Sequence, residues 1–381
     1  MFQSYASRWL ASAIVLTSST ILAPSVAQQK ATEAIAWVNA SNLDVEGVAF
    51  EDRENEFDRL PIRAKASVRQ PVWDLSQFSS GVVVRFETDS PRIHVRYDLS
   101  NPRLAMPHMP ATAVSGVDLY AENDRGNMQW AGVIKPGSTK INQKLLGNIK
   151  PKADGSPRRY DLYLPLFNRP QNLQIGVDPN SQIASATPRT EKPIVIYGTS
   201  IMHGACASRA GMTISSILGR RLDTPIINLG FSGNGRMESE VGKFLTELDP
   251  SVFVIDCLPN LDPQRVTKRC EPLVRQLREA RPDTPILLVE DRVFTNAWLR
   301  AGAESFHQDN RAALKSAYER LVADGFQNLY YLPADNLLGG DHEGATDGSH
   351  PSDLGMMRYA DAYEPVLRKI LGKQADQRPR P

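Results

Sequence analysis

The sequence predicts two structural parts: an N-terminal antiparallel β-sandwich of jelly-roll-like type and a C-terminal three-layer α/β/α domain with a five-stranded parallel sheet. Two observations indicate this division. Residues 37–177 contain many short strand patterns separated by turn residues, which is typical of a sandwich. From residue 193 onward, short apolar runs alternate with amphipathic helical segments. This alternation is typical of a parallel sheet covered by helices on both faces.

Composition narrows the class of protein. The 381 residues include 44 Lys and Arg against 43 Asp and Glu, so no excess of charge favours nucleic acid or an anionic membrane as a partner. The three cysteines are too few for a disulfide framework. No apolar run reaches the roughly 18 residues of a transmembrane helix. We therefore expect a globular protein without a stable membrane anchor.

The first 27 residues have the pattern of a secretory signal peptide. Arg8 is their only charge, residues 10–24 are mostly apolar, and residues 25–27 (Ser-Val-Ala) offer small side chains at the two positions that a signal peptidase reads. A buried helix is the alternative, but it would have no polar face and would be ended by a proline. We expect cleavage after Ala27 and export to the periplasm or the cell exterior.

Strand periodicity predicts the N-terminal part, residues 30–180. Residues 93–97 (IHVRY) alternate strictly between apolar and polar side chains, as a half-buried strand does. A turn sequence, Asn-Asp-Arg-Gly, predicts a hairpin between 117–120 and 128–130. No amphipathic helix interrupts the pattern, and residues 178–192 are polar, lack periodicity and are predicted to be a linker. Further strands are expected at 81–86, 160–164 and 173–177.

The C-terminal part, residues 190–372, contains five short apolar runs. Each run is too short for a helix and nearly continuous in hydrophobicity, which suits parallel strands that are buried on both faces. The runs occupy 193–197, 225–229, 252–257, 285–289 and 328–332. The spacing of apolar residues predicts helices at 237–248, 263–280, 307–323 and 353–371.

Side chains with catalytic potential follow the predicted strands on their carboxyl side. Ser200 follows the first strand, a Gly-rich loop with Gly233 follows the second, and Asn260 follows the third. Asp347 and His350 follow the fifth strand, directly before the last helix. Because the carboxyl ends of parallel strands meet at one edge of a sheet, these residues are expected to line one crevice.

These residue types are the ones that nucleophilic acyl transfer requires. The Ser200 hydroxyl is a poor nucleophile until a base accepts its proton, and His350 can be that base. Asp347 can hold the imidazole in the tautomer that leaves the other ring nitrogen free to accept. The oxyanion needs donors, which the backbone N–H groups of Ser200 and Gly233 and the side-chain amide of Asn260 can supply.

The four blocks resemble those of the SGNH (GDSL-type) hydrolase superfamily. Ser, Gly, Asn and Asp-x-x-His occur in the expected order and spacing over residues 193–370. The resemblance implies a flavodoxin-like fold, serine esterase or acylhydrolase activity, and no metal or organic cofactor. Two blocks depart from the family: 198–201 reads Gly-Thr-Ser-Ile instead of Gly-Asp-Ser-Leu, and 258–260 lacks the usual Gly. Neither departure removes a catalytic atom. The overall layout is also similar to that of some bacterial carbohydrate esterases.

Two further residues are candidates for substrate binding. His108 lies in a stiff apolar loop at 106–110 (Met-Pro-His-Met-Pro), which is expected either to join the core or to reach over the crevice. Arg292 follows the fourth strand and lies on the crevice side by topology. Its alternative role is an ion pair with Glu290 or Asp291.

The remaining histidines and the cysteines are given no catalytic role. His203 is too close to the candidate nucleophile on one tight turn to be its base, and His307 is expected at the surface or as a helix cap. The spacing around His342 matches no usual zinc pattern, so no metal site is predicted. The cysteines are expected to be small buried side chains, and the sequence leaves open whether Cys206 and Cys257 pair.

Together these observations predict an exported serine esterase that removes small acyl groups, above all acetyl, from a carbohydrate. Two alternatives are kept. One is a lipase or thioesterase of the same fold, which would need a long apolar channel; the loops after the strands carry Asn, Gly, Arg and His more than Leu or Phe. The other is a carbohydrate-binding protein without activity, which would require that a catalytic group be missing. The oligomeric state is not indicated.

Overall fold

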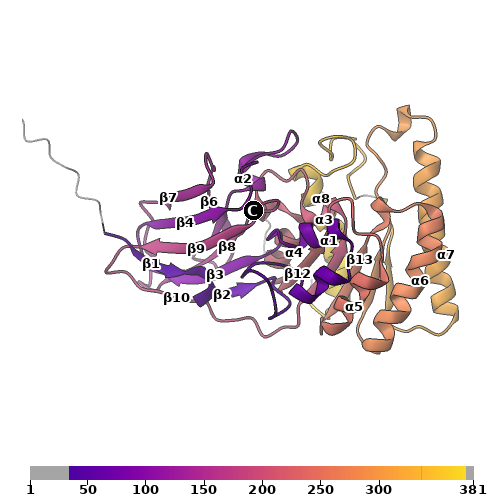
Figure 1. Ribbon diagram of the computed structural model, residues 1–381, viewed down its shortest axis with the longest axis horizontal. Coiled ribbons are helices and arrows are strands. Elements are labelled where there is room, and N and C mark those ends of the chain that lie inside the picture. Colours follow the sequence, from indigo (N-terminus) through magenta and orange to yellow (C-terminus); the bar gives the residue numbers. More distant parts are fainter. Residues whose placement is uncertain (1–33, 336, 375–381) are drawn as a thin grey trace, which may run out of the picture. The chain divides into compact units, whose positions relative to one another are not determined.

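The structure, a computed structural model, describes residues 34–335 and 337–374 (Figure 1). The predicted signal peptide at 1–27 lies outside the described residues. From Ile35 onward the chain is one compact unit. Within it, an antiparallel β-rich N-terminal region precedes a C-terminal region built on a parallel sheet, which confirms the predicted fold class. The domain boundaries 30–180 and 190–372 stay a prediction.

The N-terminal region contains two antiparallel sheets. One has the order β1-β9-β4-β7, and the other has the order β10-β3-β8-β5-β6 with β2 also paired to β3. Two short helices accompany them, α1 (Gln70–Ser76) and α2 (Ala111–Val114). The strands are β1 (Ala36–Asn39), β2 (Asp44–Glu46), β3 (Val83–Thr88), β4 (Ile93–Leu99), β5 (Asp118–Glu122), β6 (Met128–Val133), β7 (Lys140–Leu146), β8 (Arg158–Tyr163), β9 (Pro170–Val177) and β10 (Ile183–Ser185).

The two sheets enclose a core of their own. Side chains along β4 alternate between buried and half-buried positions, as the sequence predicts. Val95 and Tyr97 of β4 belong to the same buried cluster as Phe86 of β3 and Tyr160 of β8. The Phe86 and Tyr160 rings stack with their centroids 5.3 Å apart. Side chains from both sheets therefore share one core, as in a sandwich.

Two local predictions in this region are wrong. Residues 70–76 form α1, where no helix was expected. Its Trp73 is 1% exposed and packs with side chains of the C-terminal region, so tertiary burial stabilises a helix that local periodicity does not indicate. The predicted linker 178–192 contains a strand, because β10 pairs with β3 and extends its sheet.

The C-terminal region has a five-stranded sheet with the order β12-β11-β13-β14-β15, and all of its strand pairs are parallel. Among the described residues, no helix combines the length and the apolar character needed to span a bilayer. The strands are β11 (Ile194–Gly198), β12 (Ile226–Gly230), β13 (Val252–Asp256), β14 (Ile286–Val289) and β15 (Leu329–Leu332). The helices are α3 (Ser200–His203), α4 (Ile214–Leu222), α5 (Ser239–Glu247), α6 (Pro263–Ala280), α7 (Ala303–Ala323) and α8 (Asp353–Ile370).

Alternate residues of β11 face different helical layers. Ile194 and Ile196 of β11 belong to a cluster with α4 and α8. Val195 and Tyr197 belong to a second cluster with α5, α6 and α7. Since successive side chains of a strand point to opposite faces, this division gives the three layers that the apolar runs predict. Figure 1 shows the helices on either side of the sheet.

Side chains of the N-terminal region complete the C-terminal core. Tyr163 and Phe167 are buried in the cluster of α4 and α8. Arg59 is 1% exposed, and its guanidinium donates to four backbone carbonyls, those of Leu75, Phe78, Asn228 and Gly230, at 2.6–3.0 Å. The last two carbonyls belong to β12, so this cation joins the N-terminal region to the carboxyl end of a parallel strand.

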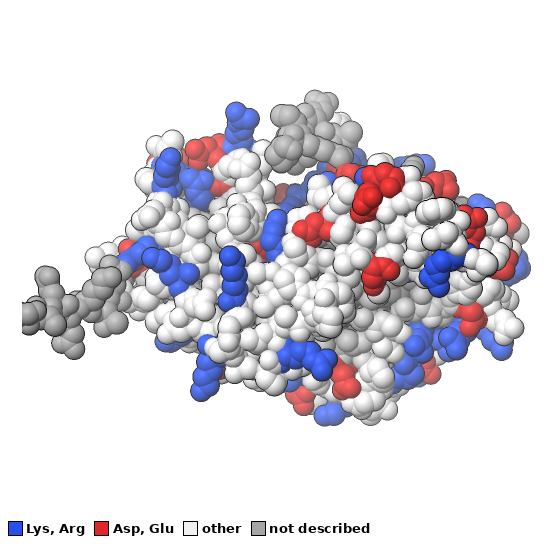
Figure 2. Space-filling model, turned by 90° about the horizontal axis from the view of Figure 1, so that it is seen from above, with Lys and Arg blue, Asp and Glu red and all other residues white. Residues whose placement is uncertain are grey.

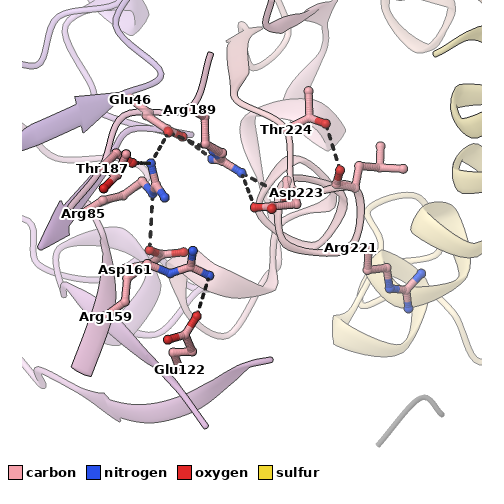
Figure 3. A network of polar contacts seen from close by, with 12 residues as sticks. Glu46, Arg85, Glu122, Arg159, Asp161, Thr187, Arg189, Arg221, Asp223 and Thr224 are labelled. Atoms are coloured by element: carbon pink, nitrogen blue, oxygen red, sulfur yellow. Dashed lines mark hydrogen bonds and ion pairs between the residues drawn. The ribbon is translucent and has the colours of Figure 1, made fainter. Parts of the chain in front are cut away.

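An ionic network gives a second connection between the regions (Figure 3). Arg85 of β3 donates to Glu46 of β2 at 2.7 Å, and Arg189 donates to the same carboxylate through its Nε at 2.9 Å. Arg189 also lies 3.4 Å from Asp223, which follows α4. The segment after β10 is therefore more than a spacer, because Arg189 pairs with carboxylates of both regions.

Candidate active site

The loops that follow β11, β12 and β13 begin at the same edge of the parallel sheet. Gly198 at the end of β11 pairs with Gly230 of β12 on one side and with Asp256 of β13 on the other. The first strand in sequence thus lies between the second and the third, and its loop opens at the point where the strand order reverses. Such a point is where α/β sheets bind their ligands.

Ser200 is the first residue of α3. Thr199 is the N-cap of this helix, and its hydroxyl accepts a hydrogen bond from the Ile201 N–H. The other end of the helix is fixed by two donors, because Asn228 Nδ2 donates to the Met202 carbonyl and Ser80 Oγ donates to the His203 carbonyl, both at 2.7 Å. A helix of only four residues is therefore held by side chains from both regions.

Three of the predicted residues form a continuous hydrogen-bonded series. Ser200 Oγ lies 2.8 Å from His350 Nε2, and His350 Nδ1 lies 2.7 Å from Asp347 Oδ2. The backbone N–H groups of Ser349 and His350 both donate to Asp347 Oδ1. Partial burial raises the pKa of Asp347, but hydrogen bonds from His350 and Ser349 outweigh it and lower the pKa to about 2. Asp347 is therefore ionised at neutral pH.

The Gly-rich loop lies against the end of β11. Gly233 has φ +69°, in the left-handed region that favours glycine, and a Cβ there would meet nothing within 4 Å. Gly235 is needed for a different reason, since a Cβ at this position would lie 1.8 Å from the Gly198 carbonyl oxygen. The Phe231 N–H donates to the same oxygen at 3.0 Å. The loop thus approaches the backbone that leads into Ser200.

Asn260 ends the short 3₁₀ turn Leu258–Asn260 after β13. Its side-chain Nδ2 is buried and has no hydrogen-bond partner among the described residues. A buried amide donor without a partner is costly, and such groups are rare in folded proteins. The amide is thus a donor available to a ligand.

The two candidate substrate-binding residues, His108 and Arg292, have different contacts in the structure. The His108 ring lies 6.5 Å from the His350 ring, with an angle of 25° between the planes. Arg292 is only 4% exposed, and its Nε donates to the Ser349 carbonyl at 3.1 Å. Its guanidinium also contacts the Ser349 hydroxyl and Asp291. The contact with Asp291 is the one expected as the alternative role of Arg292, and substrate binding by Arg292 stays a prediction.

The sequence did not indicate the surroundings of three other side chains, those of His203, His307 and Cys206. His203 is fully buried, stacks on Phe167 with 4.1 Å between ring centroids and does not line the crevice. His307 is buried instead of exposed, because its Nδ1 lies 2.9 Å from Asp291 Oδ2. All three cysteines are buried and free, and Cys206 lies beside the Asp347–His350 pair. No local sequence pattern marks these contacts, since each partner is distant along the chain.

Charged side chains of both signs are scattered over the face drawn in Figure 2. Lys and Arg side chains of the described residues lie scattered among Asp and Glu side chains and a wide uncharged surface. The formal net charge of the whole chain is +1. The surface in this view thus offers no extended field of one sign to a polyanion.

Comparison with known proteins identifies the family. The GDSL-like Lipase/Acylhydrolase family matches residues 191–368, and the family described as the N-terminus of Esterase_SGNH_hydro-type matches residues 35–183. A crystal structure of a protein from Bacteroides ovatus, described as a GDSL-like lipase, shares 34% sequence identity. The match covers 90% of this chain and 99% of that chain, with a TM-score of 0.84. The chain belongs to the GDSL-like lipase/acylhydrolase family. It is accordingly a hydrolase that acts on carboxylic esters.

More distant structures share the fold of this acylhydrolase. The salicylyl-acyltransferase SsfX3 from a tetracycline biosynthetic pathway is 18% identical, with a TM-score of 0.69 over 89% of this chain and 99% of its own. A family two carbohydrate esterase from Clostridium thermocellum, solved in complex with cellohexaose, is 13% identical, with a TM-score of 0.54 over 77% of this chain and 93% of its own. No curated protein sequence matches the chain.

Proposed function

We propose that this acylhydrolase is an exported serine esterase that hydrolyses small acyl esters, in particular acetyl esters, of a carbohydrate. The observation that carries the proposal is the hydrogen-bonded series from Ser200 Oγ through His350 to Asp347. In it a hydroxyl, an imidazole and an ionised carboxylate stand in the order that nucleophilic acyl transfer needs.

The reaction proceeds in two halves. Ser200 Oγ attacks the carbonyl carbon of the ester while His350 Nε2 accepts the hydroxyl proton, and Asp347 stabilises the imidazolium that forms. The tetrahedral intermediate collapses, and the sugar alkoxide leaves with the proton from His350. Water then attacks the acyl-enzyme with the same base, which releases the carboxylic acid and restores the Ser200 hydroxyl. No cofactor takes part in these steps.

The oxyanion is stabilised by three donors in this proposal. The backbone N–H groups of Ser200 and Gly233 and the side-chain amide of Asn260 surround the carbonyl oxygen of the bound ester. The unpartnered Nδ2 of Asn260 supports this role, because its desolvation cost is offset only when a substrate oxygen accepts its hydrogen bond. Preorganised donors of this kind are among the largest contributions to acyl-transfer catalysis.

The class of substrate is inferred from residues near Ser200 and from similar proteins. The His108 ring lies 6.5 Å from the His350 ring, and in this proposal it limits the room for the acyl group beside Ser200. The predicted export, the architecture and the cellohexaose in the structure of the distant family two esterase support a carbohydrate as the alcohol. A lipase or thioesterase would prefer long acyl chains, and a protein without activity would only bind the glycan.

Substitution of the nucleophile tests the reaction. Ser200→Ala should lower kcat for p-nitrophenyl acetate by at least about 10,000-fold, because no other group can form the acyl-enzyme. Its circular dichroism and thermal midpoint should match those of the wild type. Ser251→Ala, at the opposite end of the sheet, is the control and should keep full activity. A Ser200→Ala protein that still hydrolyses the ester would refute the assignment, and a rising rate from acetate to decanoate in the wild type would instead indicate a lipase.

The oxyanion role of Asn260 is tested by separating kcat from KM. Asn260→Ala should lower kcat by about 100- to 1,000-fold with little change in KM, since the lost donor acts mainly on the transition state. Asn260→Asp keeps the shape but removes both N–H donors, so it should lose as much activity. A rise in KM at unchanged kcat would identify Asn260 as a substrate-binding residue.

His108 is tested with two substrates of different size. His108→Ala should raise KM for an acetylated oligosaccharide more than KM for p-nitrophenyl acetate, which is too small to extend past the crevice. His94→Ala is the matched control, because His94 lies on β4 against Trp37 and should leave both constants unchanged. Equal KM values for the wild type and His108→Ala on both substrates would remove His108 from the binding site.

A further inference from the structure

Cys206 brings a third metal-binding group to the Asp347–His350 pair. One ligand atom from each of Cys206, Asp347 and His350 lies within 4.8 Å of the other two. No other group of three His, Cys, Asp or Glu side chains in the described parts of the chain meets this spacing. Thiolate, imidazole and carboxylate together form a donor set that suits Zn²⁺ and softer ions such as Cd²⁺.

The backbone at Cys206 gives independent support. Gly204 ends α3 in the left-handed conformation, and the chain then reverses so that Cys206 itself has φ +71°. A side chain in this conformation costs about 1–2 kcal/mol, which glycine would avoid. The turn nevertheless carries a thiol, and Cys206 is 7% exposed beside the catalytic loop. A strained position of this kind points to a use for its side chain.

We propose that Cys206, Asp347 and His350 form an inhibitory site for Zn²⁺ or Cd²⁺ that competes with catalysis. The bound ion is held by the Cys206 sulfur, an Asp347 oxygen and a His350 ring nitrogen, and water completes the tetrahedron. The ion is an inhibitor and not a cofactor, because it occupies the two groups that must serve Ser200.

The proton balance explains why binding stops the reaction. In the active state the single imidazole proton is on Nδ1, shared with Asp347, and Nε2 accepts from Ser200. When the ion takes Nδ1, that proton moves to Nε2 and the thiol proton is released to solvent. Nε2 then donates instead of accepting, so Ser200 has no base. Loss of Asp347 to the ion also removes the support for the imidazolium.

The consequence for activity rests on the proposed function, whereas the binding of the ion does not. The experiment therefore measures both the binding of the ion and the hydrolysis of an ester. The full-length protein is dialysed against EDTA and titrated with Cd²⁺, and the ultraviolet charge-transfer band of a Cd–thiolate bond is followed together with p-nitrophenyl acetate hydrolysis. Each protein's activity is compared with its own metal-free value.

The wild type should gain the charge-transfer band with one equivalent of Cd²⁺, lose activity in parallel and recover activity after EDTA. Cys206→Ala should lack the band and need a roughly 10- to 100-fold higher Cd²⁺ concentration for half-inhibition. Cys206→Gly should behave in the same way, and it removes the backbone strain, so it tests the site even if Cys206→Ala folds poorly. Cys270→Ala, which removes a buried thiol of α6, should behave like the wild type.

Two results would overturn the proposal: a wild type without the Cd–thiolate band, or equal inhibition of the wild type and Cys206→Gly. A wild type that shows the band but hydrolyses no ester would keep the metal site and contradict the proposed function instead.

Discussion

The buried guanidinium of Arg59 is the contact on which the arrangement of the two regions depends. It donates to carbonyls of the N-terminal region and to the Asn228 and Gly230 carbonyls of β12. Burial lowers the pKa of Arg59 to about 9, so the group keeps its charge at neutral pH. Separating a buried charge from its partners costs about 3–5 kcal/mol. Because Gly230 leads into the loop of Gly233, the same cation also fixes one side of the active site.

The N-terminal region also contacts the residues of the candidate active site. Ser80 holds the end of the helix that begins with Ser200, Phe167 stacks on the buried His203, and His108 stands beside His350. These contacts come from three different segments of the sandwich. A change in how the sandwich packs would therefore disturb Ser200 and His350 together, the two residues to which the proposal gives the nucleophile and the base.

The sequence predicted the parts of this protein that follow from local pattern. Strands of a parallel sheet that is covered on both faces require apolar runs, so β11–β15 could be predicted from the sequence. The placement of Ser200 after the first of these strands also followed from the pattern. Contacts between segments that are distant along the chain could not be predicted in this way. The strand β10 forms because β3 offers it a paired edge, His307 is buried because Asp291 pairs with it, and Cys206 reaches the catalytic loop only through a left-handed turn. No periodicity encodes these three contacts.

In the proposed reaction, Ser200 is the nucleophile that carries the acyl group. Covalent labelling tests it most directly. The EDTA-dialysed full-length protein is treated with a serine-reactive fluorophosphonate and digested, and the modified peptide is mapped by mass spectrometry. We expect one label per chain, located on Ser200, with esterase activity lost in proportion to labelling. A label on another residue, or full labelling of Ser200 with ester hydrolysis unchanged, would contradict it.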